Sequence, residues 1–67
     1  MMSGAAQTTA DRFTTRELIV EATREVAIRR HVFGKQVRAG RMDPKDADRK
    51  IDLMEAIVRR LTRTAHL

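Results

Sequence analysis

Cysteine is absent from the 67-residue chain, so neither a disulfide bond nor a thiolate zinc site can stabilise it. The only histidines, His31 and His66, are too far apart in the sequence to form a local metal-binding motif. A domain of this length buries only about 60% of the surface that its unfolded chain exposes. Because such small domains need a further source of stability, we expect the chain to associate with a second copy of itself and to hold no metal or cofactor.

Aromatic and turn-forming residues are also scarce. The chain has no tryptophan or tyrosine, two phenylalanines (Phe13 and Phe33) and one proline. A β-rich fold uses more residues of both kinds. Charged residues make up 34% of the chain, and arginine, alanine, valine, isoleucine and leucine are frequent, which is typical of exposed amphipathic helices. The composition therefore predicts an all-α protein.

Long apolar runs are missing as well. No stretch approaches the roughly 18 consecutive apolar residues of a membrane span. The first ten residues lack the basic start and apolar centre of a signal peptide, so we expect a cytoplasmic protein without membrane association. Residues 1–12 are small and polar without periodicity, which predicts a disordered tail before a single domain over residues 13–67.

A first helix is predicted over residues 15–39. Six apolar residues fall within about 100° of one another on a helical wheel: Leu18, Ile19, Ala22, Val26, Phe33 and Val37. Thr14 or Thr15 offers a capping hydroxyl, and Gly40 suits the left-handed position that ends a helix. Gly34 inside the segment indicates a kink, a close approach of another backbone, or a glycine tolerated on the surface.

A second helix is predicted over residues 44–65. Asp43 can cap its first turn, and Pro44 suits the first helical position because the missing N–H is not needed there. The apolar residues repeat at heptad-type spacing, with Ile57 widening the stripe on one side: Ala47, Ile51, Met54, Val58, Leu61 and Ala65. The opposite face is expected to be fully solvated, and its residues are Asp48, Arg49, Asp52, Glu55, Arg59, Arg60 and Arg63.

The short connection between the helices predicts an antiparallel hairpin. This arrangement sets the acidic start of the first helix beside the basic end of the second, so we expect ion pairs between the helices. Arg29, on the margin of the first apolar stripe, is expected to pair with Glu25. Two helices cannot cover both stripes, which predicts a homodimeric four-helix bundle. Its predicted interface residues are Leu18, Ile19, Val26, Phe33, Val37, Ile51, Met54, Ile57, Val58 and Leu61.

Catalytic patterns are absent from the sequence. Gly34-Lys35 lacks the earlier glycine and the following Ser or Thr of a phosphate-binding loop. No Ser–His–Asp, Cys–His or paired-carboxylate arrangement can be assembled at plausible geometry. We therefore expect an interaction protein with a protein partner, and neither an enzyme nor a binder of a small-molecule substrate.

The net charge of +5 leaves a second hypothesis open, a small basic DNA- or RNA-binding dimer. Its candidate contacts are Arg24, Arg30, Lys35, Arg38 and Arg41. Asp46 and Asp48 weigh against insertion of the second helix into a DNA groove, because aspartates at the start of a recognition helix repel phosphates.

One pattern of residues covers roughly positions 17–61 and consists of Arg24-Glu25, Arg29-Arg30, Val32-Phe33, Val37, Gly40-Arg41-Met42, Ala47, Ile51, Met54 and Ile57. This pattern resembles short uncharacterised proteins carried by bacteriophages and prophages. Those proteins often have an aromatic residue followed by proline where this chain has Phe33-Gly34. The resemblance implies a phage-encoded accessory protein or modulator acting on a host or phage component, and it implies no catalytic or binding residues.

Overall fold

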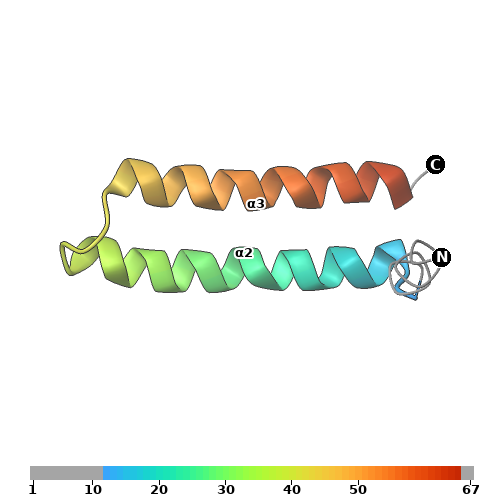
Figure 1. The fold of residues 1–67 in the computed structure, drawn as a ribbon, viewed down its shortest axis with the longest axis horizontal. Coiled ribbons are helices and arrows are strands. Elements are labelled where there is room, and N and C mark those ends of the chain that lie inside the picture. Colours follow the sequence, from blue (N-terminus) through green and yellow to red (C-terminus); the bar gives the residue numbers. More distant parts are fainter. Residues whose placement is uncertain (1–11, 66–67) are drawn as a thin grey trace, which may run out of the picture.

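The computed structural model describes residues 12–65, which form two antiparallel helices joined by a short turn (Figure 1). Helix α2 spans Thr15–Arg38 and helix α3 spans Pro44–Ala65. No strand occurs in this range. The predicted all-α hairpin is confirmed, with the first helix ending one residue earlier than expected. Residues 1–11 of the predicted tail, and His66 at the other end, lie outside the described residues.

Helix α2 begins with a reciprocal cap. The Glu17 N–H donates to Thr14 Oγ1 at 3.0 Å, and the Thr14 N–H donates to Glu17 Oε1 at 2.8 Å. The two bonds satisfy backbone donors that the first turn of a helix leaves without partners. Of the two threonines that the sequence offered, Thr14 is therefore the cap.

Replacing Thr14 with alanine is expected to lower the free energy of unfolding by about 1 kcal/mol per chain, because the capping hydroxyl is lost. Urea unfolding followed by circular dichroism measures the change. Thr15→Ala, one residue later and inside the helix, is the matched control and should have a smaller effect. If both variants lost the same stability, the capping role of Thr14 would be wrong.

The glycine that follows the end of helix α2 has the left-handed conformation, as the sequence predicted. Gly40 has φ of 75°, and its N–H donates to the Val37 carbonyl at 3.0 Å. The Arg41 N–H donates to the Gln36 carbonyl at 2.8 Å, so two otherwise unpaired carbonyls of the last turn are satisfied. This pair of bonds turns the chain away from the helix axis.

Helix α3 begins at the Asp43-Pro44 signal. Asp43 Oδ1 accepts a hydrogen bond from the Lys45 N–H at 2.8 Å, and Pro44 is the first helical residue. Both predicted roles are confirmed. Because only the residues between Arg38 and Pro44 connect the helices, α3 returns along α2.

Helix α2 continues through Gly34 without a break, and Figure 1 shows no kink there. A Cβ built on Gly34 would meet Arg38 Nη1 at 3.4 Å, an ordinary van der Waals distance, and no backbone of α3. The expected kink is therefore absent within the hairpin. The close approach of α3 is absent too, and Gly34 is a tolerated helical glycine.

The space between the helices holds little core. Half-buried apolar side chains occupy it along its length, a row that we call the seam: Ile19, Val26, Phe33, Val37, Ile51, Met54, Val58 and Leu61. Within residues 12–65 only Ala22 and Ala47 are buried, with exposed fractions of 8% and 4%. No large side chain in this range is fully buried. The hairpin alone therefore leaves much of its apolar surface in contact with water.

Candidate interaction surface

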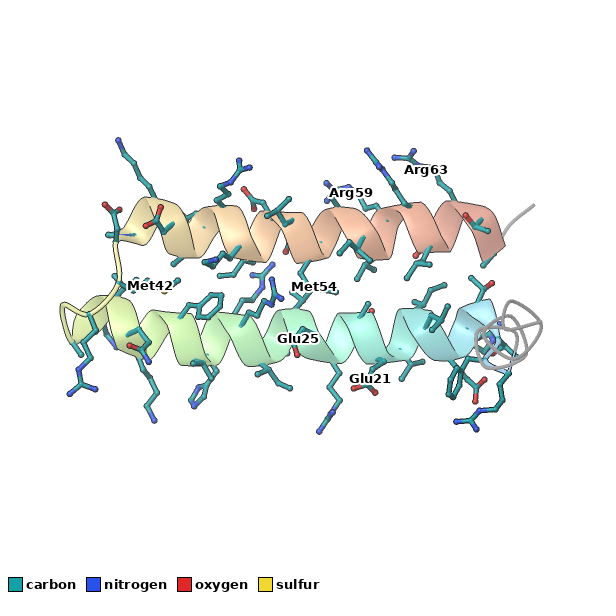
Figure 2. The ribbon with its side chains drawn as sticks, viewed as in Figure 1. Glu21, Glu25, Met42, Met54, Arg59 and Arg63 are labelled. Carbon is teal, nitrogen blue, oxygen red and sulfur yellow. The ribbon has the colours of Figure 1, made fainter. Side chains whose placement is uncertain are left out.

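The ten predicted interface residues divide into two groups. Eight of them are the seam residues, which lie half-buried between α2 and α3. Met54 is one of the eight and points towards α2 in Figure 2. The other two, Leu18 and Ile57, have exposed fractions of 43% and 47%. The predicted set therefore combines the contact within the hairpin with part of a second, uncovered surface.

Three further apolar residues are exposed beside Leu18 and Ile57. Ile28 and Val32 on α2 are 40% and 41% exposed, and Leu53 on α3 is 50% exposed. None of these three residues belongs to the predicted interface. The signal was present, because Ile28 with Val32 and Leu53 with Ile57 are spaced four residues apart, which places each pair on one side of a helix.

These five residues lie on the same side of the hairpin. Successive residues of a helix are rotated by about 100° around its axis. By this rule the same rotational sense leads from the α2 seam to Leu18, Ile28 and Val32. Leu53 and Ile57 are turned away from the α3 seam in the same sense. In an antiparallel pair of helices, equal rotations from the seam lead to the same side. We call Leu18, Ile28, Val32, Leu53 and Ile57 the apolar face.

The other side of the hairpin carries an ion pair between the helices. Arg30 Nη2 donates to Glu55 Oε2, and both residues are turned from the seam in the opposite sense to the apolar face. Arg30 and Glu55 meet because residues that are rotated equally from the seams of two antiparallel helices lie on the same side of the hairpin. The Glu55 side chain is only 29% exposed, so the prediction that Glu55 belongs to a fully solvated face is wrong.

Arg29 lies at the edge of the seam and donates two hydrogen bonds. Its Nε donates to Glu25 Oε2 at 3.0 Å, which confirms the expected pair. Its Nη1 donates to the Lys50 carbonyl of α3 at 2.9 Å. The guanidinium therefore links the helices on the side of the apolar face, and the arginine stem covers part of the seam.

The expected charge pairing between the two helices is not found at their free ends. Glu21 pairs with Arg24 of its own helix at 3.2 Å. Arg59 and Arg63 point away from α2 in Figure 2, and neither forms an ion pair within residues 12–65. The acidic start of α2 and the basic end of α3 therefore stay unpaired with each other inside one hairpin.

Four of the five candidate nucleic-acid contacts are exposed. Arg24 and Lys35 lie on the outer side of α2, Arg38 lies beside the hollow that Val37 and Ala47 line, and Arg41 lies in the turn. Among the described residues, Lys35, Arg38 and Arg41 form no ion pair. Arg30 differs, because Glu55 neutralises it.

The described residues contain neither a metal-binding cluster nor a membrane-spanning helix. No three histidine, aspartate or glutamate side chains between residues 12 and 65 are grouped closely enough to hold a metal ion. Neither α2 nor α3 has a segment long and apolar enough to cross a membrane.

Comparisons of the chain with protein-family models, with curated proteins and with solved structures found no match.

Proposed function

We propose that this chain is a non-enzymatic interaction protein whose working form is a homodimer, in which two hairpins form a four-helix bundle. The observation that carries the proposal is the burial of only two alanines among residues 12–65. A chain of this size with so little core needs another surface to cover its apolar residues. A second hairpin supplies that surface, because helices pack through apolar stripes of the kind that the seam and the apolar face provide.

The biological role that we propose is that of a phage- or prophage-encoded accessory protein or modulator. It acts in the cytoplasm of the host by binding a host or phage protein. The sequence resemblance to short phage proteins supports this setting. The dimer leaves the outer sides of α2 and α3 free, and their exposed charged residues can contact a second protein without disturbing the bundle.

Sedimentation equilibrium over a range of micromolar concentrations tests the dimer. We expect twice the mass of one chain, together with a helical circular dichroism spectrum. A compact helical monomer at every concentration would overturn the proposal. A pull-down from host lysate, split into nuclease-treated and untreated halves, then separates a protein partner from one that nucleic acid bridges.

The alternative function is nucleic-acid binding by the same dimer. The exposed basic residues of α2 and of the turn favour it: Arg24, Lys35, Arg38 and Arg41. Titration of labelled duplex DNA and RNA at rising salt tests this function, because bound phosphates release counterions and affinity then falls steeply with salt concentration. Absence of binding at low salt would remove the alternative.

A further inference from the structure

We propose that the apolar face is the dimer interface and that a second copy docks on it with its turn at the same end of the bundle. In this arrangement α2 of each chain packs against α3 of the other. The inference rests on the proposed function, since it requires a dimer. It goes further by naming the surface and the orientation of the two copies.

Two symmetric arrangements bring the apolar face onto itself. A two-fold axis parallel to the helices puts both turns at one end and sets α2 antiparallel to the partner's α3. A two-fold axis perpendicular to the helices puts the turns at opposite ends and sets α2 on the partner's α2. Both are closed dimers in which the same patch is used twice. The charges beside the apolar face distinguish them.

We call the position of a residue along the bundle axis its height. A two-fold axis parallel to the helices leaves the height of every residue unchanged. Within one hairpin, Ile19 and Thr62 line one surface hollow, and Val37 and Ala47 line another, which gives the heights at the two ends. A residue of α2 therefore meets, across the dimer, those residues of the partner's α3 that stand at the same height in its own hairpin. The contacts between chains follow from the hairpin itself.

The same-end arrangement pairs opposite charges at the free end of the interface. Glu21 stands at the height of the partner's Arg60. Both residues are exposed and lie on the flank next to the apolar face. The acidic start of α2 and the basic end of α3, which are not paired with each other within the hairpin, thus become complementary between copies.

The opposite-end arrangement is less favourable. It sets α3 antiparallel on the partner's α3, where Lys50 and Arg60 lie nearly equally far from the middle of the helix. Lys50 of one chain then faces the partner's Arg60, and like charges that face each other across an interface oppose association. The repulsion along α3 therefore decides against this arrangement.

The apolar residues also find partners in the same-end arrangement. Ile28 lies at the height between the partner's Leu53 and Ile57, and Leu18 lies beside the partner's Leu61. Docking covers the pair of Glu25 and Arg29 as well, whose side chains are 42% and 30% exposed in the hairpin. Because Arg29 already bonds Glu25 and a backbone carbonyl, the guanidinium enters the interface with partners.

Cross-linking through introduced cysteines tests the orientation, and the natural chain has no cysteine to interfere. Ile28→Cys and Leu53→Cys are made as separate full-length variants and are oxidised alone and as an equal mixture. We expect a covalent dimer in the mixture and none from either variant alone. Identical residues lie diagonally across this bundle, beyond the roughly 7 Å between Cα atoms that a disulfide spans.

A second pair, Val32→Cys with Lys50→Cys, repeats the test at another height. Sedimentation of the reduced variants and of the natural chain accompanies each oxidation. Strong cross-linking of single variants, with no gain in the mixture, would overturn the same-end orientation. Reduced variants that are dimers but never cross-link would overturn the assigned face. A natural chain that is monomeric would overturn the proposed function itself.

Discussion

Replacing Leu61 with aspartate is expected to abolish assembly and most of the helicity of the protein. Leu61 is a half-buried seam residue near the free end of the hairpin. A carboxylate there would be covered without a basic partner. An uncompensated buried charge costs about 3–5 kcal/mol, which is comparable to the whole stability that a core of this size supplies.

Met54→Asp is expected to unfold the protein as well, although by a smaller margin than Leu61→Asp. Arg29 donates to the Lys50 carbonyl, which is also the helical acceptor position for the Met54 N–H, so a guanidinium stands close to residue 54. Far-UV circular dichroism during urea unfolding, together with sedimentation, measures both variants. If Met54→Asp lowers the free energy of unfolding less than Leu61→Asp does, the guanidinium of Arg29 lies close to residue 54.

Arg59→Asp is the matched control, because it introduces the same side chain at an exposed position that points away from α2 (Figure 2). Its free energy of unfolding should change by less than about 1 kcal/mol. A loss at residue 59 as large as that at residue 61 would contradict the faces assigned to α3.

The helix boundaries were predictable because the signals are local. Gly40, Asp43 and Pro44 each act within a few residues of their own position, and the structure uses each of them as expected. Thr14 and Thr15 were left as alternatives, although the sequence distinguishes them. Only Thr14 stands three residues before Glu17, whose carboxylate completes the reciprocal cap.

The position of Glu55 was not predictable from periodicity. On a helical wheel Glu55 lies next to charged residues, and nothing in α3 alone indicates a partner. The ion pair with Arg30 depends on the relative height and rotation of the two helices, which are set by the packing of side chains 25 residues apart in sequence. A pattern within one helix carries no information on that relation.

The division of the predicted interface residues between the seam and the apolar face was not predictable for the same reason. The apolar stripes of α2 and α3 are wider than one contact, and periodicity does not tell which part faces the other helix of the same chain. The structure assigns Val26 and Met54 to the seam and leaves Leu18 and Ile57 exposed. Ile28 lies outside the single stripe that periodicity indicates, whereas a helix in a four-helix bundle contacts two neighbours.

Replacing Ile57 with aspartate is expected to raise the dimer dissociation constant at least 100-fold. Ile57 is 47% exposed in one hairpin, so the substitution removes little packing from α3 and α2 of the same chain. In the proposed dimer each of the two copies would bring a carboxylate to the height of the partner's Glu25. The 100-fold change corresponds to about 2.8 kcal/mol shared between two equivalent sites.

Val20→Asp is the control for this prediction, because Val20 is β-branched like Ile57, 62% exposed, and located within α2. It is turned from the seam in the opposite sense to the apolar face and should change the dissociation constant by no more than about threefold, a difference of roughly 0.6 kcal/mol. Sedimentation across a dilution series gives both constants. If Val20→Asp dissociated the dimer and Ile57→Asp did not, the second copy would dock on the other side of the hairpin.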